Sequence, residues 1–297
     1  MSRALRLYLA LLAGLLLVWL ALRAGAAGGL AGLASLGGAP ALAPALLLYA
    51  ASHLCRMLRL AMLSLDQREH VPALLAAHGL TAFPSSFLPF KIGEILRLAA
   101  FLHVFPGRRK ALAVWLAERC ADVLVLSALM LGLAMVEVTL PAPMRTVFLL
   151  FLAASAFVLL TLFAAAKTFV YLNRHLVLAS TSARGLMVLR ASHALRQLEL
   201  ELLRSLEGRL TGLLLLSVLI WLLEISALAL FLAHLAPSGS GLATLFAHGL
   251  LANLSPGQSG LGPGPGPGQY QPLVLAALAL LSMAALALAR RLHQGKS

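Results

Sequence analysis

Long apolar runs separated by short polar segments dominate the hydrophobic pattern of this chain. Long uncharged runs include Tyr8 to Leu22, Val123 to Val136, Thr146 to Ala166 and Leu210 to Leu223. They approach or reach the roughly 20 residues that a helix needs to cross a bilayer. Because lipid offers an open backbone no hydrogen-bond partners, such runs predict helices rather than strands. The expected spans are 5–22, 41–63, 111–136, 145–166, 210–235 and 272–289.

Two further hydrophobic segments are interrupted. The stretch from Val71 to Phe105 begins and ends beside basic clusters and contains FPSSFLPFKIG, which predicts a re-entrant hairpin or two tilted short helices. The run from Gly241 to Leu254 is too short to cross comfortably and stops at the Gly/Pro-rich segment Ser255 to Gly268, where a helix cannot continue. Breaks at Pro84 to Gly93 and at Ser255 to Gly268, entering from opposite faces, suggest the inverted repeat of a transporter. The alternative for the second break is an outer loop of no special function.

The segment 167–209 has a different pattern. Leucines recur at spacings of three and four, whereas polar residues take another face, as in an amphipathic helix. The leucines are Leu195, Leu198, Leu202 and Leu206, and the polar residues are Arg190, His193, Gln197, Glu201 and Arg204. We expect this cytoplasmic connection to lie along the membrane surface, where arginines meet anionic headgroups. A solvated connector is the alternative.

Composition supports a membrane location. The 297 residues are 61% hydrophobic and 11% charged, with a mean hydropathy of +0.94, whereas soluble domains are about 45–50% apolar. The predicted fold class is an all-α polytopic membrane protein with about seven or eight membrane segments, including two broken or re-entrant hairpins. We expect one transmembrane domain over residues 1–297.

The net charge of +13 would suggest nucleic-acid binding in a soluble protein. Here the positive-inside rule explains it better, because most of the 23 Lys and Arg residues cluster at segment ends that the predicted topology places on one face. Arg3 and Arg6 precede the first apolar run, and Arg290 and Arg291 follow the last. We expect the first run to be an uncleaved span; a signal peptide cleaved near the small residues AGAAGG is the alternative. We therefore expect both termini to be cytoplasmic in the cell inner membrane, and no nucleic-acid partner.

A small set of ionisable residues remains at membrane depth: Lys91, Glu94, Arg97, Glu118, Arg119, Asp122 and Glu224. A charge there costs at least about 2.5–3.5 kcal/mol, so such groups pair or face a wet cavity. Glu94 and Arg97 share one helix face, and so do Glu118 and Asp122. We expect Arg97 to lie between these two carboxylates of the neighbouring helix.

This network has two interpretations. It is either a neutralised packing lock between helices, or a polar groove that receives a charged lipid headgroup while the acyl chains stay in the bilayer. In the groove, Lys91 and Arg97 attract phosphate, which suits the planar donor fork of arginine. Glu224 is isolated in sequence, and His53 and His78 are expected to be single packing residues.

The central block resembles the transmembrane region of lysylphosphatidylglycerol synthases and the stand-alone flippase-like proteins related to it. The resemblance lies in LPFKIGEILRLAAFL and ALAVWLAERCADVLVL. The family pattern falls on Pro89, Lys91, Gly93, Glu94, Arg97, Glu118, Arg119 and Asp122. SPGQSGLG resembles the family's C-terminal Pro-Gly-Gly-x-Gly segment, and it adds Ser255 and Gln258 to the substrate-binding candidates. Two departures concern Ser85 and Ser86, where relatives often carry asparagine, and an absent acidic residue after the C-terminal glycines.

The resemblance implies a role in moving or handling lipid between leaflets. The chain has no long polar stretch for an aminoacyl-transfer domain, and no Walker motif, zinc-ligand spacing or GxSxG motif. We therefore expect a lipid translocase that binds an anionic or phosphate-bearing headgroup, with no catalytic residue, cofactor or metal. One alternative is a membrane scaffold that regulates an envelope lipid or polysaccharide enzyme. Another is a membrane-embedded lipid transferase that uses Glu94 or Asp122 as a general base.

Overall fold

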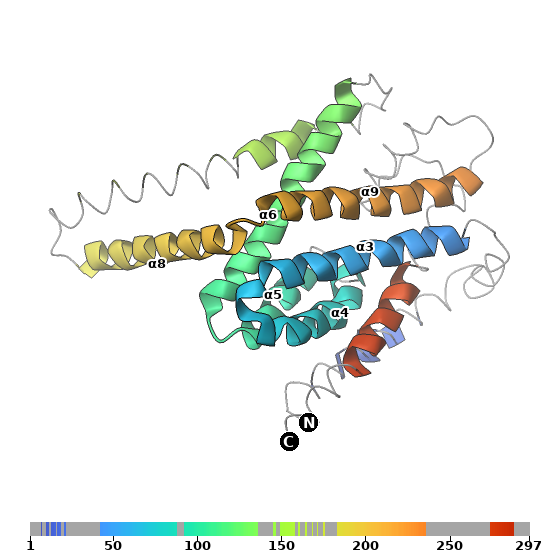
Figure 1. Ribbon diagram of the computed structural model, residues 1–297, viewed down its shortest axis with the longest axis horizontal. Coiled ribbons are helices and arrows are strands. Elements are labelled where there is room, and N and C mark those ends of the chain that lie inside the picture. Colours follow the sequence, from blue (N-terminus) through green and yellow to red (C-terminus); the bar gives the residue numbers. More distant parts are fainter. Residues whose placement is uncertain are drawn as a thin grey trace. The chain divides into compact units, whose positions relative to one another are not determined.

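The computed structural model describes residues 42–87, 92–135, 183–235 and 274–287, with shorter helical pieces within 7–21 and 145–175. All regular elements in this described part are helices (Figure 1). They are α3 (Leu42–Leu63), the 3-10 helix η1 (Leu65–His70), α4 (Val71–Phe87), α5 (Ile92–Val104), α6 (Arg108–Met135), α8 (Ala183–Leu206), α9 (Leu210–Leu235) and Val274–Ala287. The predicted all-α class is confirmed. The number of membrane segments stays a prediction.

The chain forms two compact units, each of which combines distant parts of the sequence. The first unit contains Met1–Leu54, Pro72–Ala100 and Leu222–Ser297, and the second contains Cys55–Val71 and Phe101–Trp221. Helices α3 and α9 contribute residues to both units.

Two described helices are long and apolar enough to cross a membrane, over Ala43–Leu63 and Leu210–Phe231. One face of α3 carries Leu47, Leu54 and Leu58, which are 70%, 66% and 58% exposed. Leucines spaced seven and four residues apart lie on one side of a helix. An exposed leucine face of this kind suits contact with lipid, in agreement with the predicted span. Helix α6 has 28 residues, but Glu118, Arg119 and Asp122 interrupt its apolar run.

Helices α4 and α5 occupy most of the stretch where the sequence predicts a break. Helix α4 continues through Pro84 to Phe87 and α5 begins at Ile92, whereas residues 88–91 lie outside the described part. A re-entrant hairpin and two tilted short helices both stay predictions. Proline in a helix interior has no N–H to donate, and the next residue, Ser85, donates its hydroxyl to the Thr81 carbonyl at 2.6 Å, a bond that often accompanies a bend.

Ser282, on the Val274–Ala287 helix, also supports the backbone of α4. Its hydroxyl donates to the Gly79 carbonyl at 2.8 Å and accepts the Phe83 N–H at 3.4 Å. In a regular helix these two backbone groups bond to each other, so a hydroxyl that bonds to both favours a bend. Gly79 permits the close approach, because a Cβ there would lie 2.5 Å from the Cβ of Ala285.

Helix α5 crosses α4 closely at Gly93. A Cβ at this position would overlap the backbone of Ser85. Only glycine lets two backbones approach so closely. The crossing fixes the start of α5, and therefore the positions of Glu94 and Arg97 relative to α4.

Within the predicted connection 167–209 lies the helix α8, which packs against α6 (Figure 1). Its leucines Leu195, Leu198, Leu202 and Leu206 are half-buried, as are Gln197 and Glu201, whereas Arg190, His193 and Arg204 are exposed. Gly208, with φ of 69°, turns the chain from α8 into α9, a conformation that glycine adopts without strain. The placement of α8 on a membrane surface stays a prediction.

Several predictions concern residues outside the described part. These are Lys91, Ser255, Gln258, the run 241–254 and the break 255–268. The inverted repeat and the positions of the termini therefore stay predictions, as does the single domain.

Candidate functional site

The second unit contains a fully buried ion network centred on Arg59 of α3. Its Nη1 donates to Asp122 Oδ1 at 2.6 Å and to the Ser217 hydroxyl at 2.8 Å, and its Nη2 donates to Glu118 Oε1 at 3.1 Å. The side chains of Arg59 and Glu118 are 0% exposed and that of Asp122 is 5% exposed. One guanidinium thus joins α3, α6 and α9.

Further groups complete the coordination of Asp122. Trp221 Nε1 donates to its Oδ1 at 3.3 Å, and Arg119 Nη2 lies 3.5 Å from its Oδ2. The guanidinium of Arg56 lies over the Trp221 ring at 6.0 Å, within the range of a cation–π contact. The formal charges of Arg59, Arg119, Glu118 and Asp122 cancel, as expected for charges removed from water.

These two carboxylates share one buried arginine, Arg59. The expectation that Arg97 lies between them stays a prediction, because Arg97 belongs to the other unit. The sequence interpretation assigned Arg59 to the basic cluster at the end of its span. The sequence did contain evidence for a role inside the membrane. Ser52, Arg56 and Arg59 recur at spacings of four and three, which places them on one face of the helix.

The first unit holds the other buried arginine, Arg97 on α5, which is 3% exposed. Its Nη1 lies 3.9 Å from Glu94 Oε1, one helical turn earlier, and the Glu94 side chain is 23% exposed. This ion pair is longer than the contacts of Arg59 and reaches a carboxylate that is accessible to solvent. The pair lies in the first two turns of α5 and begins directly after the close crossing at Gly93.

Glu224, which is isolated in sequence, contacts a polar residue of another helix in the structure. In the first unit the Ser52 hydroxyl on α3 lies 3.2 Å from Glu224 Oε1 on α9, and Glu224 is 8% exposed. A carboxyl group at this depth is a functional candidate by default. The sequence could not assign its partner, because the two residues are 172 positions apart.

A third polar cluster lies at the end of the predicted spans, in the second unit. Lys110 is buried, and its Nζ donates to Asp66 Oδ2 at 2.6 Å and to the Ser205 hydroxyl at 2.9 Å. Arg209 Nη1 lies 3.6 Å from Asp66 Oδ1. Burial alone would raise the pKa of Asp66, but the hydrogen bond and charge of Lys110, together with Arg209, lower it below its usual value. The cluster therefore joins η1, α6, α8 and the turn that precedes α9.

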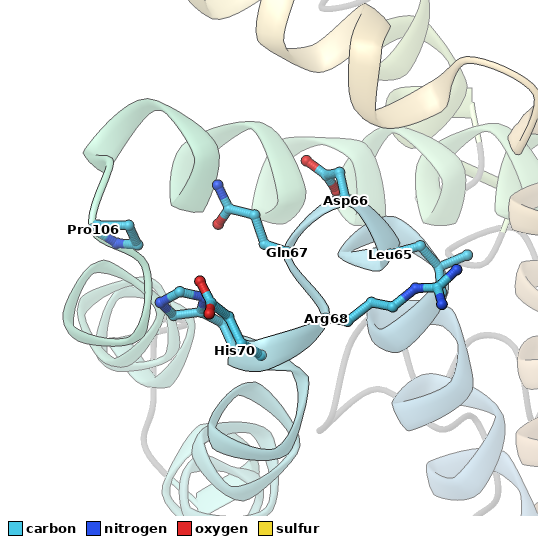
Figure 2. Close-up of a pocket in the computed structure, with 7 residues that line it drawn as sticks. Leu65, Asp66, Gln67, Arg68, His70 and Pro106 are labelled. Carbon is cyan, nitrogen blue, oxygen red and sulfur yellow. The ribbon is translucent and has the colours of Figure 1, made fainter.

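Beside this cluster, residues 65–70 and Pro106 line an open hollow on the surface (Figure 2). Figure 2 shows the polar side chains of η1, including Asp66 and Arg68, around it. Gln67 has a non-helical backbone, with φ of −131° and ψ of 56°. The hollow is lined by both acidic and basic groups, so it does not favour one sign of charge. It is therefore a weaker candidate for an anionic headgroup than the region around Arg97 on α5.

Among known protein families, residues 6–264 match the family described as the lysylphosphatidylglycerol synthase TM region. Neither a curated protein nor a solved structure matches the chain.

Proposed function

Because the chain belongs to the lysylphosphatidylglycerol synthase TM-region family, we propose that it is a lipid translocase. Membership makes it a membrane protein of a lipid-related family. The finer proposal is that it moves a lipid with an anionic, phosphate-bearing headgroup between leaflets without ATP hydrolysis. The headgroup occupies a polar site within the membrane, and the acyl chains remain in the bilayer.

The observation that carries this proposal is the buried Arg97 at the start of α5. Transporters bind substrate where membrane helices are interrupted, and α5 begins at Ile92, within the stretch FPSSFLPFKIG where the sequence predicts a break. The N-terminus of a helix favours an anion, and an arginine can donate two parallel hydrogen bonds to a phosphate. Glu94, which is partly exposed beside Arg97, can release the guanidinium to an entering headgroup. Lys91 adds a second cation to the proposed site.

The proposal divides the predicted site residues into two roles. Lys91, Glu94 and Arg97 contact the headgroup. Glu118, Arg119 and Asp122 hold α6 against α3 and α9, because Arg59, Ser217 and Trp221 already occupy the carboxylates. This division also argues against the transferase alternative that uses Asp122 as a general base, since its oxygens accept hydrogen bonds from Arg59 and Trp221. We accordingly propose that the protein is not an enzyme.

The scaffold alternative draws on the Arg59 network, whose close contacts suit a rigid packing lock. Lipid movement by the purified protein distinguishes the two. The protein is reconstituted into vesicles of phosphatidylcholine and phosphatidylglycerol, and the transfer of fluorescent phosphatidylglycerol between leaflets is followed. Transfer above the rate of empty vesicles supports the translocase. Its absence, together with co-purification of an envelope enzyme, supports the scaffold.

The role of Arg97 is tested in the same assay. We expect Arg97→Gln to abolish transfer while the protein still folds, as judged by its melting temperature. Arg190→Gln, on an exposed position of α8, is the matched control and should retain transfer. Full transfer by Arg97→Gln would remove Arg97 from the headgroup site.

We propose a location in the inner membrane with both termini in the cytoplasm. Cysteines introduced at Arg108, Arg184 and Lys296 should react with an impermeant reagent only from the cytoplasmic side, and one at Thr139 only from outside. Labelling of the cysteine at position 184 exclusively from outside would overturn this topology.

A further inference from the structure

The hollow beside η1 is formed by a segment that is held at both ends (Figure 2). At the start of η1, Asp66 contacts Lys110 Nζ at 2.6 Å and Arg209 Nη1 at 3.6 Å. At its end, the His70 ring stacks on Phe105 with ring centroids 6.1 Å apart, and Phe105 is 3% exposed. All of these residues belong to the second unit. Restraint at both ends lowers the cost of ordering the side chains between them around a ligand.

The charges that a ligand meets in the hollow are of both signs. The carboxylate of Asp66 is already paired with Lys110 and Arg209. The exposed Arg68 guanidinium has no ion-pair partner in the part of the chain that the structure describes. The Glu69 side chain is 82% exposed, and its Oε1 lies 3.5 Å from His70 Nδ1. One accessible cation beside one accessible carboxylate favours a ligand that carries both charges, because a ligand with only one sign would be repelled by one of the two.

Between the two ends, Gln67 adds a hydrogen-bond acceptor. Its Oε1 is buried and accepts no hydrogen bond from the residues that the structure describes. An acceptor that is removed from water without a donor is costly. The terminal torsion of a glutamine side chain is soft, so the amide can turn its oxygen toward a donor in the hollow while the backbone stays in place. A ligand with an N–H or O–H donor would therefore satisfy a group that the protein leaves unpaired.

The hollow directly follows a candidate membrane span. Helix α3 is long and apolar enough to cross a membrane and ends at Leu63, and η1 begins at Leu65. Residues just beyond a spanning helix reach the polar headgroup region of a bilayer. Leu65 lines the hollow and is 41% exposed, so it offers an apolar contact to the part of a lipid next to its headgroup.

We propose that the hollow formed by residues 65–70 and Pro106 binds a zwitterionic phosphodiester with a primary ammonium group, the chemistry of a phosphatidylethanolamine headgroup. Arg68 donates to the phosphate, and Glu69 and Gln67 Oε1 accept from the ammonium group, which has three N–H donors. A trimethylammonium group has no N–H, so a phosphocholine leaves Gln67 unpaired and binds more weakly. The inference goes beyond the proposed translocase and does not rest on it, because it concerns other residues and a ligand without net charge.

The experiment measures binding to the purified full chain in detergent through its melting temperature. The probes are dihexanoyl-phosphatidylethanolamine and dihexanoyl-phosphatidylcholine, which share their acyl chains and differ in the ammonium group. A ligand that binds the folded protein raises the melting temperature as its concentration increases. We expect the ethanolamine lipid to bind about tenfold more tightly or better, the effect of one hydrogen bond to a charged group.

The water-soluble diester glycerophosphoethanolamine identifies the source of the ligand. Binding as tight as that of the ethanolamine lipid would assign the site to a soluble compound of the same chemistry. Weaker binding than that of the lipid would assign it to a membrane lipid, with Leu65 contributing to the affinity. Either result supports recognition of the phosphate and ammonium pair.

Two variants separate recognition from folding. Gln67→Leu removes an acceptor that is buried and unpaired, so the melting temperature without ligand should stay the same or rise, while the preference for ethanolamine is lost. Gln197→Leu, at a half-buried position of α8, is the matched control and should keep the preference. Arg68→Gln should weaken the binding of both lipids, whereas Arg190→Gln on the exposed part of α8 should not.

The outcomes decide the proposal. A preference for ethanolamine that is lost in Gln67→Leu and kept in Gln197→Leu supports the site. Equal binding of the two lipids by the wild type, a preference that persists in Gln67→Leu, or no effect of any probe on the melting temperature overturns it. Each of these results leaves the translocase proposal in place, because that proposal is tested by the transfer of phosphatidylglycerol.

Discussion

The two buried arginines of this protein have different surroundings. In the second unit, Arg59 contacts Asp122 at 2.6 Å, Ser217 at 2.8 Å and Glu118 at 3.1 Å, all on other helices. In the first unit, Arg97 pairs with Glu94 on its own helix at 3.9 Å. A guanidinium held by several helices stabilises their packing. One that pairs over a longer distance with a partly exposed carboxylate suits a reversible contact with substrate. Burial of an arginine in a membrane protein therefore does not by itself define its role.

The largest expected effect on stability is that of replacing Arg59. Arg59→Gln removes the buried cation that Glu118 and Asp122 share, and the loss of one partner of a buried pair costs about 3–5 kcal/mol. We expect a strong loss of folded yield and of melting temperature in detergent. Glu118→Gln should cost less, because Arg59 keeps Asp122. A larger loss of stability in Arg97→Gln than in Arg59→Gln would reverse the two roles.

A substitution at Gly93 tests whether lipid transfer requires the close crossing of α4 and α5 that positions Arg97. In Gly93→Ala the new methyl group overlaps the Ser85 backbone, and overpacking of this kind costs about 1–3 kcal/mol. We expect a lower melting temperature and a loss of lipid transfer. Gly132→Ala is the control, since it lies in α6 with nothing within 4 Å of its new Cβ, and it should be neutral or stabilising. Normal transfer by Gly93→Ala would show that the crossing does not position the site.

A substitution at Ser282 tests the interior of α4, where its hydroxyl bonds to Gly79 and Phe83. Ser282→Ala removes the hydroxyl that bonds to Gly79 and Phe83. One lost hydrogen bond with a partner left buried costs about 1–3 kcal/mol, although Gly79 and Phe83 can recover part of it by bonding to each other. We expect a destabilisation near the lower end of this range in thermal unfolding, together with slower lipid transfer. An unchanged transfer rate would show that lipid transfer does not depend on the bonds between Ser282 and α4.

The smallest expected effect is the contribution of Asp66 to the pH dependence of the melting temperature. Its folded pKa is lowered by Lys110 and Arg209, so its stabilising contribution is present above the unfolded pKa, about 3.9. The contribution is lost as the pH falls through the lower folded pKa. We expect the melting temperature of the wild type to fall more between pH 5 and pH 3, on the order of a few degrees at most, than that of Asp66→Asn. The effect is small because Asp66 is 43% exposed and solvent screens the pair. Identical pH profiles would contradict a stabilising role for Asp66.

The sequence alone determined the features that depend on neighbouring residues. Length and apolar composition predicted α3 and α9, and the spacing of leucines predicted the buried face of α8. The motif around Lys91 to Asp122 was enough to predict the family. These features are local, because helix formation and amphipathic periodicity require only residues within a few turns of one another.

Only the tertiary structure decided which polar groups meet. From sequence, Arg59 belonged to a basic cluster at a span end, whereas Arg97 was the expected partner of Glu118 and Asp122. The packing of α3 against α6 and α9 brings Arg59 to these carboxylates, a contact that the sequence did not predict. In the same way, His53 met His78, Ser52 met Glu224, and Ser282 reached the backbone of α4. The physical reason is that an ion pair or hydrogen bond requires contact within a few ångströms. The helical period fixes the face on which a side chain lies, but which face packs against which depends on the fit of whole helices.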